Sequence, residues 1–256
     1  MTALQQAFWL FARLMRNLAR QPIWISIMLV QPMFWLLLYS QLFRRITDLP
    51  GFGTRSYIDY LTPGIAVMTA FFSGTWAGMG TIEDLDRGVV ERFLATPVRR
   101  SALIAARVLQ SAVTAMLQAL IILLVGLALG ATNGGVDGWV VILLAAGLVA
   151  AAFSGISNGI ALLTRQEATM IAVANFIGLP LLFFSSILIA RRLIPEWMRI
   201  LSGGNPVEWA VRAARGQALV AAGAGHVALY LALLVAFSVA TGGFATWAFR
   251  AYQRTL

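Results

Sequence analysis

Long apolar runs alternate with short polar gaps along the chain, and this pattern predicts membrane-spanning helices. An α-helix needs roughly 20 apolar residues to cross about 30 Å of hydrocarbon. Six stretches are long enough: residues 22–43, 60–81, 102–129, 138–163, 169–190 and 227–249. The alternating ten-residue pattern of a membrane barrel does not occur in this sequence. The pattern therefore predicts one all-α integral membrane domain over residues 1–256, with six transmembrane helices and both termini on the same side.

The N-terminal segment, residues 1–21, predicts an amphipathic helix that lies in the membrane interface. The segment lacks the basic start, the apolar block and the small-residue cleavage site of a signal peptide. Its apolar and polar side chains occupy different sides of a helix, with Leu4, Phe8, Phe11, Leu14 and Leu18 on one and Arg13, Arg16, Asn17 and Arg20 on the other. A plain polar lead-in to the first span is the alternative interpretation.

The longest gap between spans, residues 191–226, predicts a pair of short helices at the outer membrane boundary. The first helix ends at a Gly-Gly pair, which is typical of a helix C-terminus. The second begins with Asn205 as its cap, Pro206 at the first helical position and Glu208 three residues after the cap. Glu208 and Arg212 are four residues apart, so we expect them to pair on one face.

The composition also indicates that lipid is the main solvent of the molecule. Of the 256 residues, 60% are hydrophobic and 11% are charged, whereas a soluble domain carries about a quarter charged residues. There is no Cys, which excludes disulfides and thiolate metal sites, and no group of residues forms a metal-ligand motif. The net charge of +9 comes from Arg alone. These arginines lie between the apolar runs, where they favour phospholipid head groups over nucleic acid.

The distribution of arginines also gives a weak preference for orientation. With the N-terminus inside, the interior loops and tails hold ten arginines and the exterior holds eight. Positive charge is enriched on the cytoplasmic side of membrane proteins. The sequence therefore favours cytoplasmic N- and C-termini.

A short motif at residues 201–205, LSGGN, differs by one residue from the LSGGQ signature of ATP-binding cassette ATPases. A phosphate-binding loop of the form GxxxxGK[ST] requires a Lys, and this chain has none. A signature motif without a nucleotide site has nothing to act on, so we interpret LSGGN as the junction of the two short helices. We expect no cofactor and no catalytic residue in this chain.

A serine and a histidine raise the alternative of a rhomboid-like intramembrane serine protease. Ser157 lies in a GISNG sequence of the fourth span, and His226, the only His, opens the sixth. Ser157 lies 19 residues deeper than Gly138, which is roughly 28 Å along a helix and far from the end that carries His226. The spacing of Gly155 and Gly159 is instead typical of close helix packing.

Few polar side chains lie within the spans, and four of them form one stripe on the third span. Gln110, Thr114 and Gln118 follow Arg107 at helical spacing. Such a stripe either lines a substrate path or bonds to a neighbouring helix. The candidate path residues are Phe71, Phe72, Trp76, Gln110, Thr114, Gln118 and Asn175. No paired carboxylates for proton transfer lie within the spans, which favours an external source of energy.

One compact charged segment, residues 83–100, interrupts the apolar chain. It carries eight charged side chains, in a chain with 19 Lys plus Arg and 10 Asp plus Glu. Residues 85–95 are compatible with a helix of about three turns, half apolar and half charged, and Pro97 stops it. A helix this short cannot cross a bilayer, but it can insert between the membrane domain and a soluble partner. A solvated loop is the alternative interpretation.

The charged segment resembles the cytoplasmic loop of the ABC type-2 transporter permeases, in particular their daunorubicin-resistance branch. That branch carries G-x-x-[ED]-R-[FL]-x-x-x-P-x-x-R after the second span, and residues 88–100 read GVVERFLATPVRR. Residues 179–186, 194–198 and 205–206 are similar to the family's P-x-x-F-x-S-G, P-x-W and N-P blocks, in that order. The chain departs from the family at Ser186, where Gly is usual, and at Arg191-Arg192. The resemblance covers essentially the whole chain.

The resemblance implies a membrane subunit of a bacterial plasma-membrane exporter for a hydrophobic drug, antibiotic or lipid-like compound. The pathway would form from two copies of the chain, as a homodimer. A separate subunit would bind ATP and Mg²⁺ and receive the coupling helix of residues 82–101 in a groove. The implied coupling residues are Asp86, Arg87, Gly88, Glu91, Arg92, Phe93, Thr96, Pro97, Arg99 and Arg100. A membrane scaffold without transport activity is a third interpretation.

Overall fold

The computed structural model describes residues 3–20, 22–48, 56–94, 100–189, 191–219 and 224–254. All regular structure in these ranges is helical, which confirms the predicted fold class. The α-helices are α1 (Ala3–Ala19), α2 (Pro22–Leu42), α3 (Tyr57–Trp76), α4 (Met79–Asp86), α5 (Val89–Leu94), α6 (Arg100–Ala128), α7 (Gly135–Thr164), α8 (Glu167–Phe183), α9 (Glu196–Ser202), α10 (Pro206–Ala218) and α11 (Ala224–Gln253). Two 3-10 helices are η1 (Arg44–Asp48) and η2 (Arg191–Leu193).

Four helical stretches among the described residues are long and apolar enough to cross a membrane. They are Tyr57–Asp86, which joins α3 and α4, Ser101–Ala128 in α6, Gly135–Thr164 in α7 and Gly225–Gln253 in α11. The first and fifth predicted spans correspond to shorter apolar stretches, Ile27–Leu42 and Glu167–Phe183. The structure thus supports a multi-pass helical membrane protein.

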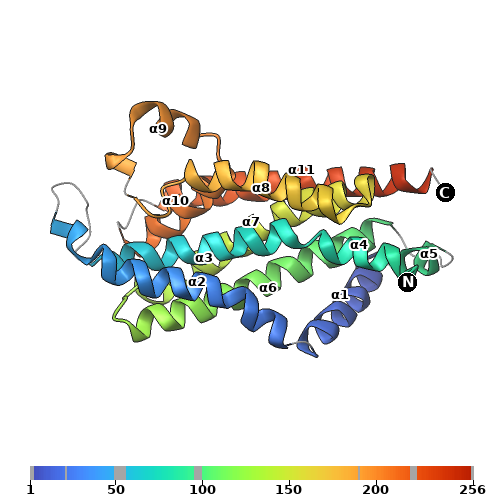
Figure 1. Cartoon of the computed structure of the whole chain (residues 1–256), viewed down its shortest axis with the longest axis horizontal. Helices are drawn as coiled ribbons and strands as arrows, with labels where there is room; N and C mark the ends of the chain where they lie inside the picture. Colours follow the sequence, from blue (N-terminus) through green and yellow to red (C-terminus); the bar gives the residue numbers. More distant parts are fainter. Residues whose placement is uncertain are drawn as a thin grey trace.

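Helix α7 lies at the centre of the bundle and packs against α3, α6, α10 and α11 (Figure 1). Small residues on α7 allow its neighbours to approach closely. A Cβ added at Gly155 would lie 2.8 Å from the backbone of Thr241, and one at Gly159 would lie 2.4 Å from the Phe244 ring. This confirms the packing interpretation of the two glycines, because both face α11.

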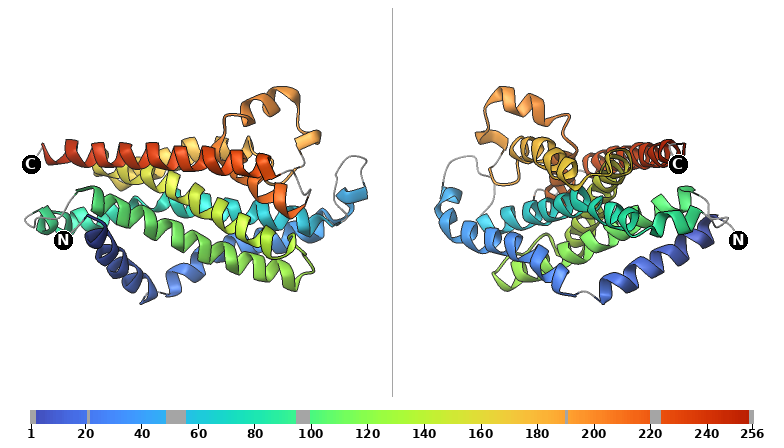
Figure 2. Two further views of the ribbon diagram at one scale, coloured as in Figure 1. Left: turned by 180° about the vertical axis from the view of Figure 1, so that it is seen from behind. Right: turned by 45° about the vertical axis from the view of Figure 1, so that its right-hand side comes forward.

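The two ends of the bundle differ in what they carry (Figures 1 and 2). Helices α1, α4 and α5 and the C-terminal end of α11 lie at one end, here called the α5 end. The 3-10 helix η1 and helices α9 and α10 lie at the opposite end, here called the α9 end. Helix α9 projects from the bundle, whereas α10 packs against α3, α7 and α11.

The fifth predicted span, residues 169–190, is wrong at its C-terminal side, because α8 ends at Phe183. Ser186 and Ile187 are not helical, and their backbone groups bond to side chains of α10 instead. The Ser186 N–H donates to Glu208 Oε2 at 2.7 Å, and the Ile187 carbonyl accepts from Arg215 Nη2 at 2.6 Å. Tertiary contacts therefore end this helix before its apolar sequence ends.

Candidate functional site

The charged segment lies at the α5 end, but it does not form the single helix predicted from residue 85 to 95. Helix α4 ends at Asp86, and α5 begins at Val89. Gly88 between them has a φ of +65°, a left-handed conformation that glycine adopts without strain. Asp86 and Leu85 thus belong to the end of the second span, and only the six residues of α5 form a separate helix.

Helix α5 and the turn before it have an apolar side and a charged side. Val90 is buried in a cluster that contains Ile104 of α6, Leu162 of α7 and Phe249 of α11. The side chains of Asp86, Arg87 and Arg92 are exposed. Arg87 forms an ion pair with exposed Glu83, at 2.6 Å. The arrangement anchors α5 to three long helices and leaves charged side chains exposed.

The other residues implied for this segment lie at or beyond the described part. Gly88 forms the turn between α4 and α5, as above. Thr96, Pro97 and Arg99 lie outside the described residues. The backbone of Glu91, Phe93 and Arg100 is helical, but their side chains lie outside the described part.

Asp84 of α4 and Arg107 of α6 form an ion pair just inside the α5 end. This pair borders a cavity of about 290 Å³, which also touches α1. Three of the predicted path residues, Trp76, Gln110 and Thr114, line the same cavity. The structure therefore brings the first half of the polar stripe together with the charged end of α4.

The other four predicted path residues do not line this cavity. Phe71 lines a separate apolar cavity of about 340 Å³ between α3, α7 and α8, and the half-buried Phe72 packs beside it. Gln118 is buried, with its Nε2 lying 3.7 Å from Met28 Sδ. Asn175 is exposed on α8, and its Nδ2 donates to the Ile171 carbonyl at 2.9 Å. Gln118 and Asn175 therefore do not line either cavity.

Ser157 has no histidine near it, so the described structure does not form the serine–histidine site of a protease. Its Oγ donates to the Thr75 carbonyl at 2.6 Å and accepts from the Gly78 N–H at 2.8 Å, at the junction of α3 and α4. His226 lies instead beside Tyr230, in the first turn of α11. Ser157 is thus a packing residue that joins α7 to this junction.

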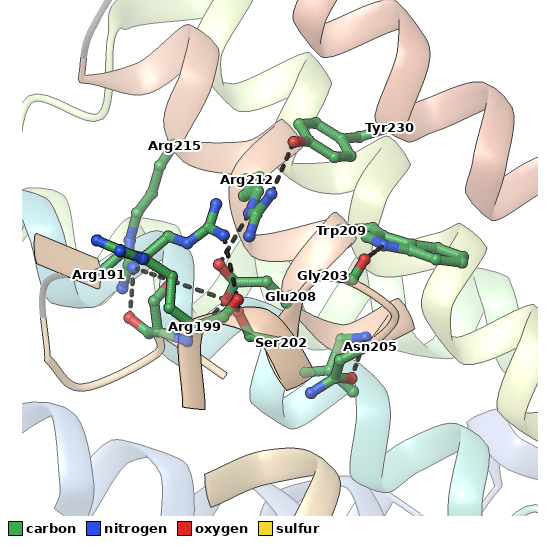
Figure 3. Close-up of polar contacts among 12 residues, drawn as sticks. Arg191, Arg199, Ser202, Gly203, Asn205, Glu208, Trp209, Arg212, Arg215 and Tyr230 are labelled. Atoms are coloured by element: carbon green, nitrogen blue, oxygen red, sulfur yellow. Dashed lines mark hydrogen bonds and ion pairs between the residues drawn. The ribbon is translucent and has the colours of Figure 1, made fainter. Parts of the chain in front are cut away.

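At the α9 end, the two short helices form as predicted (Figure 1), and Figure 3 shows the polar contacts around them. Asn205 caps α10, because its side chain accepts from the Val207 N–H at 2.9 Å, and its Nδ2 donates to the Leu181 carbonyl at 2.6 Å. Trp209 Nε1 donates to the Gly203 carbonyl at 2.7 Å, which holds the junction that the LSGGN sequence forms. The motif is therefore the turn between α9 and α10.

Glu208 has no exposed surface. Its carboxylate accepts hydrogen bonds from Arg212 and Ser186. Its Oε1 accepts from Arg212 Nε at 2.9 Å, which confirms the predicted pair. Its Oε2 accepts from both the N–H and the hydroxyl of Ser186, at 2.7 and 2.8 Å. The carboxylate thus links α10 to the chain that follows α8.

Arg215 is the residue at this end that the sequence interpretation missed. Its guanidinium is buried 3.5 Å above the Tyr60 ring and donates to the carbonyls of Tyr60, Ser186 and Ile187. Burial lowers the pKa of Arg215, and the nearby Tyr60 and Glu208 oppose that shift. A signal was present, since Glu208, Arg212 and Arg215 follow at intervals of four and three on one face of α10.

Comparison with known proteins identifies the family. The sequence profile described as ABC-2 type transporter matches residues 5–219. The chain belongs to the ABC-2 type transporter family. This match runs from α1 to the end of α10, so it includes helices at both the α5 end and the α9 end of this ABC-2 permease. The family is one of membrane transport permeases, which confirms the resemblance carried by the charged segment.

Individual relatives of this ABC-2 permease agree with that assignment. The chain is 30% identical over 217 residues to the protein named transport permease ycf38 of Cyanophora paradoxa, covering 83% of this chain and 73% of the relative. It is 24% identical over 196 residues to the daunorubicin resistance ABC transporter permease protein DrrB1 of Streptomyces coeruleorubidus, covering 76% of this chain and 68% of the relative.

Proposed function

We propose that the chain is the membrane subunit of an ATP-driven exporter of a hydrophobic drug, antibiotic or lipid-like compound. A separate subunit that binds ATP and Mg²⁺ docks on the α5 end, which faces the cytoplasm of a bacterial cell. Helices α2 and α8 complete six spans, α1 lies in the membrane interface, and a second copy of the chain completes the pathway. The observation that carries the proposal is α5, whose Val90 is buried among three long helices while Arg92 is exposed.

The connections of α5 support its role as the coupling element. Because α4 continues α3 with only a short interruption, a displacement of α5 is passed along the second span. The Asp84–Arg107 pair passes the same displacement to α6. The cavity lined by Trp76, Gln110 and Thr114 lies between these helices, so movement of α4 relative to α6 changes its shape. That cavity is the proposed entry of the substrate path.

The test reverses two adjacent charges of α5, at positions 91 and 92. The double variant Glu91→Arg/Arg92→Glu is expected to lose drug-stimulated ATP hydrolysis in the complex by roughly tenfold or more, since charge pairs at an interface are each worth about 1.5 kcal/mol or more. Membrane insertion should be unchanged, because the apolar runs that form the spans keep their sequence and Arg92 is exposed. The measurement is ATP hydrolysis by the purified complex, together with the amount of ATP-binding subunit that co-purifies.

A matched control lies at the opposite end of the bundle. The pair Glu196 and Arg199 on α9 is exposed and 3.5 Å apart, so Glu196→Arg/Arg199→Glu also exchanges two surface charges. This control should hydrolyse ATP as the unmodified complex does. Equal stimulation in both double variants would contradict the coupling role, and failure of any ATP-binding subunit to co-purify with the unmodified chain would favour a scaffold.

A further inference from the structure

The α9 end contains a cavity of about 520 Å³ that the proposed export function does not use. We call it the α9-end cavity. Its charged lining residues are Arg191 of η2 and Glu208, Arg212 and Arg215 of α10. Tyr60, Ser186, His226 and Tyr230 add polar groups, and Val211 and Val227 add apolar walls. Three guanidinium groups therefore share this space with one carboxylate.

Among the described residues that line this cavity, the positive charges are not balanced by negative ones. The hydrogen bonds that Arg215 donates go to neutral oxygens of Tyr60, Ser186 and Ile187. Glu208, the one carboxylate, is already shared between Arg212 and Ser186. Holding cations in a buried place without anions is unfavourable. The lining thus carries an excess of two positive charges, which an anion would neutralise.

Two of the guanidinium groups also have nitrogen atoms without partners. Among the described residues, Arg212 Nη2 and Arg191 Nε are buried and have no hydrogen-bond acceptor. Arg212 Nε and Nη1 are fixed by Glu208 at 2.9 Å and by the Tyr230 hydroxyl at 2.8 Å (Figure 3). Burial, and then the neighbouring Arg212 charge, lowers the pKa of Arg191. Both guanidinium groups therefore have a donor that no described residue uses, and that of Arg212 is held in position by its other two bonds.

We propose that the α9-end cavity binds a phosphate-type oxyanion through the guanidinium groups of Arg191 and Arg212, which line it. Guanidinium groups match the oxygens of phosphate in geometry, and charge-assisted bonds of this kind are stronger than neutral ones. Arg215, whose own donors are occupied, contributes its charge to the site. Val211 and Val227 form an apolar part of the lining, against which an apolar group of the same ligand would pack. The same chemistry is found in free phosphate and in the head group of an acidic phospholipid.

The experiment measures binding to the full chain, without any ATP-binding subunit. The protein is purified in an uncharged detergent, and its thermal unfolding midpoint is followed by Trp fluorescence. One arm adds inorganic phosphate against chloride at equal ionic strength. The other adds dioleoyl phosphatidylglycerol against dioleoyl phosphatidylcholine. A ligand that binds the folded state alone raises the midpoint in proportion to its affinity.

Three variants locate the site. Arg191→Gln and Arg212→Gln each remove one proposed donor, and the apparent affinity should fall roughly tenfold or more. Arg199→Gln is the matched control, because it removes a positive charge from α9 outside the cavity, and it should bind as the unmodified chain does. Arg191→Gln remains informative if Arg212→Gln fails to fold, since the one hydrogen bond that Arg191 donates among the described residues goes to the Arg199 carbonyl, at 3.2 Å.

The outcomes distinguish a free oxyanion, a lipid head group and the absence of an anion site. A shift with inorganic phosphate identifies a free oxyanion, and a shift with phosphatidylglycerol alone identifies a lipid head group. Either supports the proposal if Arg191→Gln weakens the binding and Arg199→Gln does not. Equal shifts in all the variants, or no shift in either arm, overturn it. Because ATP hydrolysis is not measured, the result is independent of the proposed export function.

Discussion

At the scale of single residues, the polar groups of α10 decide the structure of the α9 end. Glu208 is fully buried, yet each of its oxygens accepts from a fixed donor. Breaking a buried pair by removing one partner is costly, because the other charge is left without compensation. The pair of Glu208 and Arg212 was predicted from its spacing. The other partner of Glu208, Ser186, is 22 residues away in sequence and was not predicted.

Replacing Glu208 by Gln should therefore destabilise the protein by about 3 kcal/mol. The amide keeps an acceptor for Ser186 but removes the charge that faces Arg212. The measurement is the unfolding midpoint of the purified chain in detergent. Glu196→Gln, in an exposed pair on α9, should change stability by less than about 0.5 kcal/mol. Equal effects of the two substitutions would show that the buried network contributes little.

At the scale of helices, the junction of α3 and α4 is held against α7 by a close approach of two backbones. A Cβ added at Gly78 would lie 2.5 Å from the Ser157 carbonyl oxygen, and the Ser157 hydroxyl bonds across the same contact. The second span could be predicted from its apolar length. Its contact at Gly78 could not, because nothing local to that glycine distinguishes it from Gly80.

Substituting these two glycines by Ala should have opposite effects. Gly78→Ala forces α4 away from α7 and should cost about 1–3 kcal/mol, as overpacking usually does. Gly80→Ala meets only Arg107 Nη1, at 3.8 Å, and should be neutral or stabilise the helix by up to about 1 kcal/mol. Thermal unfolding of both variants measures the difference. A stable Gly78→Ala protein would mean that the junction is not held by this contact.

At the scale of the whole molecule, the two ends of the bundle should face opposite sides of the membrane. The charged turn and α5 lie at one end, and α9 with its exposed Trp197 and Ile200 lies at the other. Both Arg92 and Arg199 have exposed side chains at their respective ends. The chain has no Cys, so a cysteine introduced at either position is the one thiol present.

Labelling of intact cells tests this arrangement. Arg199→Cys should react with a membrane-impermeant maleimide added outside, whereas Arg92→Cys should react only after the membrane is made permeable. The cysteine-free parent chain should not react under either condition. Labelling of both variants from the same side would contradict the proposed topology.

The sequence by itself determined that the chain is helical and membrane-embedded, where α10 begins, and which short charged segment stands apart. These properties depend on the length of apolar runs and on local capping chemistry, such as Asn205 before Pro206. The same local rules predicted the Glu208–Arg212 pair and the small face of Gly155 and Gly159. The resemblance of the charged segment to a family motif was also visible in the sequence alone.

Only the tertiary structure decided which apolar helix is central and which polar residues meet. In α7, 67% of the most apolar window is buried inside the protein, against 17% in α11, although both are long apolar helices. Apolar side chains are favourable both against lipid and inside the protein, so composition does not show which apolar helix is central. The early end of α8 and the position of Arg215 depend on bonds between segments far apart in the chain. Local patterns contain no information about such partners, because those bonds exist only once the helices have packed.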